Sequence, residues 1–322
     1  MKAKLRESKK MNAVKQSFTK LAVLWALAVV FLGLTFSTKN FLSIMNLRNI
    51  LDQQAFVLII AGFATIVMIS GGFDVSLGAI YILSPIIALK VENATGSVLA
   101  MVLAGAAVGV LAGTLNGLII AFGKINSFIT TLATSFMLFG LAYILSDGSI
   151  LTLSNFESRS FVTTRILGIT SASWMAFLVL IVCWILLERT RFGRSIFALG
   201  GNIEAARLSG VRVARLQVIA FTLGGLGAGL AGALNSIRTT SAQASDDFSV
   251  IFAVIAAIVV GGTSIAGGSG AIWRSIAGVF FIAVLVNGFN LNGIDPVYQR
   301  IIQGLVILLA VGADSVRSKR ST

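Results

Sequence analysis

Glu188-Arg-Thr-Arg-Phe-Gly-Arg194, followed by Gly200-Gly-Asn-Ile-Glu-Ala-Ala-Arg-Leu-Ser-Gly210, is a charged segment between two long apolar stretches. Charged side chains are costly in lipid, so this segment is expected in water or against another protein. A long basic loop between apolar spans is typical of the cytoplasmic side of a membrane. The segment therefore predicts that the chain crosses a membrane on both sides of it.

The rest of the chain fits this prediction. Of its 322 residues 57% are hydrophobic and only 11% are charged, and the mean hydropathy is +0.95. About ten apolar runs are long enough to span a bilayer as helices. The sequence predicts an all-α polytopic membrane protein with about ten transmembrane helices, at residues 21–36, 55–71, 75–91, 97–122, 126–145, 171–187, 214–235, 248–265, 272–290 and 297–313.

The distribution of basic residues predicts the orientation. With the N-terminus inside, 18 of the 25 Lys and Arg residues fall in inner segments, so the net charge of +13 is a topology signal and not one for nucleic acid. We expect a basic cytoplasmic tail at 1–20, a single transmembrane domain at 21–313 and a cytoplasmic tail at 314–322. The first run is interpreted as an anchor, because no small-residue cleavage site follows it cleanly.

Composition also restricts the chemistry. The sequence has no His and a single Cys, Cys183 in the middle of an apolar run, which excludes a disulfide within the chain and argues against a metal site. No phosphate-loop motif occurs, so any ATP would be bound by a partner subunit. We expect no catalytic residue and no enzymatic activity in this chain.

Small residues and prolines indicate how the helices pack. Gly105, Gly109, Gly113 and Gly117 share one helix face, and Gly225 and Gly229 repeat the spacing, which favours close helix contacts. Pro85 is expected to kink or interrupt the third span. The amphipathic stretch at residues 40–54 is expected on the outer membrane interface.

A carboxylate stands between two apolar spans in Gly71-Gly-Phe-Asp-Val-Ser-Leu-Gly78. Asp74, with Ser76, is a candidate for substrate contact or gating, because ionisable groups inside membranes are usually functional. The alternative is local: Asp74 caps the next helix by accepting its free amide hydrogens.

Further polar candidates lie on the fifth and ninth spans. A hydroxyl stripe with one aromatic ring either lines a polar path or makes routine bonds within and between helices; it comprises Ser127, Phe128, Thr130, Thr131 and Thr134. The amides Asn287 and Asn290 suit a hydroxylated ligand. The glycine-rich segment 261–270 is a hinge, a re-entrant element or a plain turn. The helical stretch 204–210 is either a docking element or an interfacial helix.

Together these motifs resemble the permease subunits of bacterial ABC importers, in the ribose and monosaccharide branch. The resemblance runs from about residue 40 to 313 and rests on six elements in order: Asn40-Phe-Leu-Ser-Ile44, 71–78, Phe128-Ile-Thr-Thr-Leu132, Thr190-Arg-Phe-Gly-Arg194, 200–210 and 261–268.

The resemblance implies a permease of the vitamin-B12-importer type (type II), multi-pass in the bacterial inner membrane. Its partners would be a second permease in a homodimer or heterodimer, a periplasmic or lipid-anchored sugar-binding protein, and an ATPase subunit that binds ATP and Mg²⁺. The loop 188–212 would dock on this ATPase, through Arg194, Gly201, Asn202, Glu204, Ala205, Ala206, Arg207 and Gly210.

One departure from the family pattern stands in the eighth span. Relatives usually carry an acidic pair where this chain has Ile251 and Ala253, while Asp246 and Asp247 lie nearby but out of register. We expect an ATP-driven importer for a monosaccharide or related polyol. The alternatives are an ABC permease for a non-sugar solute, an ion-coupled secondary transporter, which should carry several carboxylates within its spans, and a scaffold without transport.

Overall fold

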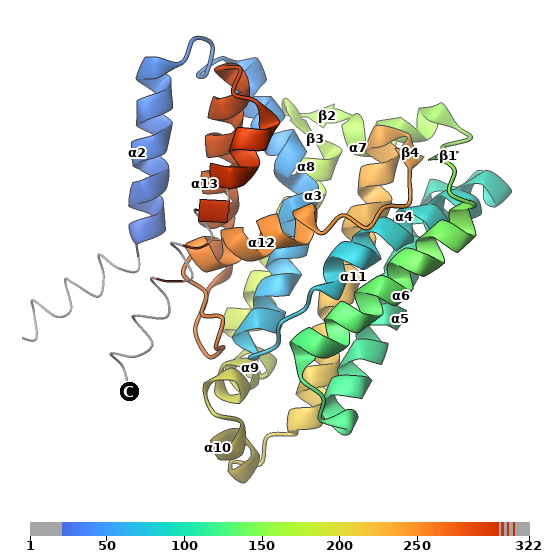
Figure 1. Ribbon diagram of the computed structural model, residues 1–322, viewed down its shortest axis with the longest axis vertical. Coiled ribbons are helices and arrows are strands. Elements are labelled where there is room, and N and C mark those ends of the chain that lie inside the picture. Colours follow the sequence, from blue (N-terminus) through green and yellow to red (C-terminus); the bar gives the residue numbers. More distant parts are fainter. Residues whose placement is uncertain (1–20, 303, 306–307, 309–311, 313–322) are drawn as a thin grey trace, which may run out of the picture.

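A computed structural model describes residues 21–302, 304, 305, 308 and 312, and its long helices form one bundle (Figure 1). The long elements are α2 (Ala22–Ser37), α3 (Ile44–Ile69), α4 (Ser76–Thr95), α5 (Val98–Gly123), α6 (Ser127–Ser146), α8 (Ser171–Trp184) with its π-helical continuation η2 (Ile185–Arg189), α11 (Val213–Thr239), α12 (Ser249–Val260) and α13 (Ile272–Leu291).

Short elements connect these helices: β1 (Leu151–Thr152), η1 (Phe156–Arg159), α7 (Ser160–Thr163), β2 (Arg165–Ile166), β3 (Ile169–Thr170), α9 (Arg191–Gly201), α10 (Ile203–Leu208) and β4 (Ser241–Ala242). The strands form two antiparallel pairs, β1 with β4 and β2 with β3. Figure 1 shows these pairs at one end of the bundle, the hairpin end, and α9 and α10 at the other, the coupling end.

The helical membrane architecture is confirmed. Seven helices among the described residues are long and apolar enough to cross a bilayer. The predicted span 248–265 is wrong in length, because α12 has 12 residues and ends at Val260. Two residues later the backbone turns at Gly262, which takes a positive φ of 88°. Twelve helical residues rise only about 18 Å. Of the predicted tenth span, residues 297–302 are helical, while most of the remainder and both predicted tails lie outside the described residues.

The glycine prediction for α5 is confirmed. A Cβ at Gly109 would collide with the carbonyl oxygen of Gly225 on α11, and a Cβ at Gly225 would collide with that of Gly109. A Cβ at Gly105 would lie 2.5 Å from the Cβ of Ala233. The two backbones therefore touch directly, as small residues permit in membranes. Among the described residues this pair forms the most extensive helix contact, and α4 packs against both helices.

Two local predictions are corrected in part: residues 44–54 are the start of a long helix, and Pro85 does not interrupt α4. Residues 44–54 do not form a separate interfacial helix, since α3 begins at Ile44 and continues without a break to Ile69. Ser43 caps it by accepting the Asn46 amide at 3.2 Å, and Asn46 and Ile50 are buried. Likewise α4 runs uninterrupted through Pro85. The same helix offers Ser84, whose hydroxyl donates to the Gly229 carbonyl at 3.1 Å across to α11.

Candidate functional site

Asp74 belongs to a buried polar cluster at the start of α4. One carboxylate oxygen accepts the Ser76 amide at 2.9 Å and the Ser76 hydroxyl at 2.6 Å, as a helix cap does. Asn116 on α5 donates its Nδ2 to the Ser76 hydroxyl at 2.8 Å. The second Asp74 oxygen and the Asn116 Oδ1 are buried without a hydrogen-bond partner among the described residues. The cluster caps α4 and leaves two acceptors for a further donor.

The hydroxyls of α6 hold the segment before α4 in place. Ser127 accepts the Phe73 amide at 3.1 Å, and Thr131 accepts the Val75 amide at 3.2 Å. Thr130 donates to the carbonyl of Asn126, the residue that caps α6, and Thr134 donates to that of Thr131, at 3.1 Å each. These bonds are of the kind expected if the hydroxyl stripe makes routine bonds within and between helices. Its ring, Phe128, is 44% exposed and packs edge-on against Phe73, with centroids 5.8 Å apart.

Amide side chains gather in a cavity of about 440 Å³ between α3, α12 and α13. Asn287 and Asn290, both predicted, line it from α13. Sequence reasoning missed four amides that line it from α3, namely Asn46, Asn49, Gln53 and Gln54. No charged side chain of the described residues lines this amide cavity. It can offer paired donors and acceptors to a neutral polar molecule.

Part of the amide cavity is fixed by internal bonds. Asn46 donates to Asn287 at 2.9 Å, and Asn287 donates back to Asn46 at 2.8 Å. Asn290 accepts the Gln299 amide at 2.8 Å. Asn49, Gln53 and Gln54 have no hydrogen-bond partner among the described residues, so their amides are available to a ligand. Their spacing at i, i+4 and i+5 places them near one face of α3. This spacing is a sequence signal for the cavity, but the interpretation of residues 40–54 as an interfacial stretch overlooks it.

Ile251 and Ala253, which stand where the resemblance leads us to expect an acidic pair, lie in different surroundings. Ala253 lines the amide cavity from α12, whereas Ile251 is 1% exposed and packs against Gly78. Asp247 caps α12 by accepting the Ser249 amide at 2.8 Å. An acidic residue at position 253 would therefore face the cavity, and Asp247 does not replace it because its carboxylate is engaged at the helix start.

The loop 188–212 folds into two helices at the coupling end. The helical stretch predicted at 204–210 is confirmed as α10, capped by Asn202, which accepts the Ala205 amide at 2.9 Å, and followed by Gly210 with φ of 82°. The preceding helix, α9, was missed. Of the residues proposed for ATPase docking, Ala206 is buried and Arg194, Gly201, Asn202, Glu204, Ala205, Arg207 and Gly210 are exposed or partly exposed. Leu208, also missed, is 87% exposed.

Glycines join α9 to the transmembrane bundle. A Cβ at Gly200 would collide with the Ile69 carbonyl, and one at Gly267 would lie 2.7 Å from the Cα of Gly71. Gly268 donates its amide to the Ile69 carbonyl at 2.8 Å. The segment 261–270 is thus a turn packed between the end of α3 and the end of α9. The ends of α9 and α3 are therefore in direct backbone contact at this turn.

Comparisons with known proteins identify related permeases. A family model described as branched-chain amino acid transport system / permease component matches residues 46–311. The ribose import permease protein RbsC of Escherichia coli strain K12 is 36% identical over 90% of this chain and 92% of its own. The same protein of Bacillus subtilis is 38% identical over 93% and 94%. No solved structure gives a significant match.

An arabinose transporter subunit is similar over nearly the whole length. The L-arabinose transport system permease protein AraH of Escherichia coli strain K12 is 35% identical over 96% of each chain. The alignments of all three relatives extend over both the amide cavity and the coupling end.

Proposed function

The chain belongs to the branched-chain amino acid transport system permease family, and we propose that it is the membrane-spanning subunit of an ATP-driven importer for a monosaccharide or related polyol. The relatives that support this are named as import permeases for ribose and as a permease of an arabinose transport system. Like them, this chain is a transport component and not an enzyme.

The amide cavity is the observation that carries the choice of a sugar. A monosaccharide presents several neutral hydroxyl groups, each both a donor and an acceptor, which amides match in pairs. A free amino acid presents an ammonium and a carboxylate, whose desolvation requires opposite charges or several strong hydrogen bonds. Since no charged side chain of the described residues lines the cavity, its chemistry favours the sugar over an amino acid.

The position of the cavity fits a transport pathway. It lies near the start of α3 and the end of α13, toward the hairpin end, which the basic-residue distribution places outside. We propose that a solute released by an external binding protein, periplasmic or lipid-anchored, passes these amides. A second permease, identical or different, would complete the pathway on the other side. Asp74, Ser76 and the α6 hydroxyls remain proposed pathway residues deeper in the bundle.

At the opposite end, α10 is the proposed contact with the ATPase subunit, which would bind ATP and Mg²⁺. Its polar residues Glu204 and Arg207 form only an exposed pair at 3.5 Å, so both remain accessible to a partner. Leu208 is 87% exposed, and burial of its side chain in an apolar groove on a partner would be favourable. Alternating access would follow when a movement of α10 and α9 reaches α3 through the glycine contacts.

Uptake by proteoliposomes tests the solute assignment. The chain would be reconstituted with its ATPase and binding protein and supplied with labelled monosaccharides and branched-chain amino acids. We expect ATP-dependent uptake of a monosaccharide, reduced about tenfold by Asn49→Leu or Gln53→Leu, because each removes a hydrogen bond worth about 1.4 kcal/mol. Gln243→Leu is the control, since this exposed amide lies outside the cavity.

Two outcomes contradict the proposal in different ways. Uptake of branched-chain amino acids without uptake of sugars would favour the family description over the cavity argument. Uptake that persists without the ATPase would revive the ion-coupled alternative.

A further inference from the structure

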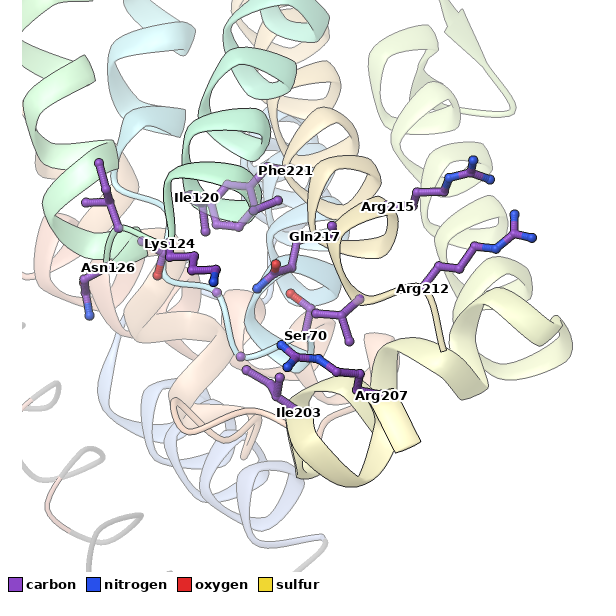
Figure 2. A pocket seen from close by; sticks show the side chains of 17 residues that line it. Ser70, Ile120, Lys124, Asn126, Ile203, Arg207, Arg212, Arg215, Gln217 and Phe221 are labelled. Atoms are coloured by element: carbon purple, nitrogen blue, oxygen red, sulfur yellow. The ribbon is translucent and has the colours of Figure 1, made fainter. Parts of the chain in front are cut away.

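A second cavity, of about 590 Å³, lies at the coupling end (Figure 2). It is bounded by the end of α5, the start of α6, the segment 70–72, α10 and the start of α11. Four cationic side chains are among its lining residues: Lys124, Arg207, Arg212 and Arg215. No carboxylate of the described residues lines it. This basic cavity is distinct from the amide cavity, and of the proposed pathway residues only Ser127, at the start of α6, lines it.

Two of the four cations point into the basic cavity. Figure 2 shows the side chains of Lys124, Arg207 and Gln217 directed toward one another, while those of Arg212 and Arg215 extend away. The three convergent side chains come from three different elements, namely the α5–α6 connection, α10 and α11. Lys124 takes a left-handed φ of 54° as it ends α5, which fixes the position of its backbone beside the cavity.

The convergent donors are largely uncommitted. The Lys124 ammonium and the Gln217 amide have no hydrogen-bond or ion-pair partner among the described residues. Arg207 contacts Glu204 at 3.5 Å in an exposed pair one turn apart, with side chains 62% and 72% exposed, and such pairs are weak. A cluster of like charges is unfavourable on its own, so an anion between Lys124 and Arg207 would relieve their repulsion.

We propose that the basic cavity binds a phosphate group, carried by an acidic phospholipid of the adjacent leaflet or by a phosphorylated solute. A guanidinium binds phosphate through two parallel hydrogen bonds, a lysine adds a point charge and an amide adds a neutral donor. The volume falls within the range of small-molecule sites. Basic pockets between transmembrane helices on the cytoplasmic side suit lipid headgroups. Ile125, which is 47% exposed, gives the lining an apolar side chain.

An occupied cavity would influence the coupling helix. The bound phosphate would link Lys124, beside α6, to Arg207 on α10. It would therefore favour the arrangement of α6 and α10 that this structure shows. A ligand shifts an equilibrium only by its preference for one arrangement. This consequence rests on the proposed role of α10 as the ATPase contact: the phosphate group would modulate that coupling step.

Binding to the purified full-length chain tests the proposal. In one arm, native mass spectrometry measures phosphatidylglycerol retained from nanodiscs that contain it with phosphatidylcholine. In the other, calorimetry in pure phosphatidylcholine nanodiscs measures inorganic phosphate and a hexose phosphate. We expect Lys124→Gln to lower affinity about tenfold or more in the arm that shows binding, because it removes a charge-assisted hydrogen bond. Lys124→Arg should preserve binding, and thermal unfolding should show all variants folded.

Arg215→Gln is the matched control, because it removes the same charge from a side chain that points away (Figure 2). It should change affinity less than twofold. Retention of phosphatidylglycerol assigns the site to a lipid, and binding of phosphate or hexose phosphate assigns it to a solute. Absence of binding in both arms, or equal losses in Lys124→Gln and Arg215→Gln, would overturn the proposal. Neither readout requires transport or the ATPase, so this failure would leave the proposed function intact.

Discussion

At the residue scale, paired amides set the geometry of the amide cavity. Asn46 and Asn287 exchange two hydrogen bonds between α3 and α13, far apart in the sequence. Asn46 also donates to the Phe41 carbonyl at 2.9 Å, so its side chain ties the loop before α3 to the helix. A buried amide that loses its partner bears the full cost of desolvation.

Asn46→Leu should therefore destabilise the chain by about 1–3 kcal/mol, because Asn287 and the Phe41 carbonyl lose their partner. Reversible unfolding in mixed detergent micelles measures this difference. Asn49→Leu is the control, since Asn49 is exposed and its side chain has no bond within the described structure. Equal stability of Asn46→Leu and the wild type would show that the reciprocal pair does not hold α3 on α13.

The contact between α5 and α11 offers a second residue-scale prediction. Gly109→Ala should cost about 1–3 kcal/mol, because its methyl group meets the Gly225 carbonyl and the helices must separate. Gly140→Ala on α6 adds the same methyl group where nothing lies within 4 Å, and its stability should be unchanged or higher. The same unfolding measurement applies. A loss that is equal in both variants would refute the direct backbone contact.

The sequence was informative about single residues where one physical cause dominated. The glycine stripe was predictable because small residues every four positions have one common use in membranes. The amides of α3 were not, because polar residues along an apolar helix are equally consistent with a headgroup interface. The amides of α3 line a cavity because α12 and α13 pack against this helix. These helices are distant from α3 in the sequence, so the contact could not be predicted from the local pattern.

At the element scale, hydropathy located the long helices but not their ends. The α3 helix begins 11 residues before its predicted span, because Asn46 and the other amides of its first turns are satisfied by protein or line a cavity. The sequence after α12 stays uncharged, so hydropathy does not mark its end, whereas the backbone turns at Gly261 and Gly262. The α9 helix has a charged and glycine-containing sequence that resembles a loop, and packing of Ile196 and Leu199 against the bundle stabilises it.

The α10 helix carries the element-scale prediction. Leu208→Glu should abolish co-purification of the ATPase, because the charge would be desolvated in an apolar groove of the partner. The fold of the chain should be unaffected, since Leu208 is 87% exposed. Affinity purification after mild solubilisation, followed by quantification of the two subunits, measures the effect. Leu208→Met keeps an apolar side chain of similar size and should retain the ATPase.

This substitution is a sharper test than removing the loop. Deletion of residues 196–210 would also remove Ile196, Leu199 and Gly200, which pack against the bundle, so loss of the ATPase would not be specific to docking. An unchanged amount of ATPase with folded Leu208→Glu would exclude this leucine from the contact.

At the scale of the whole molecule, α3 connects the two ends. Its 26 residues extend about 39 Å, from the amides near Asn46 to Ile69 at the glycine junction with α9. Most of its second half is buried, so it forms a central element of the bundle. We infer that the state of the coupling end reaches the amide cavity through this helix.

The central claim is that this chain works as one subunit of an ATP-driven importer. The direct measurement is the composition of the complex obtained when the tagged chain is purified in mild detergent from its native membrane. The account predicts one nucleotide-binding subunit with a phosphate loop for each permease, and a second permease copy or a different permease beside it. A chain that is isolated alone, even after gentle cross-linking, would contradict the account.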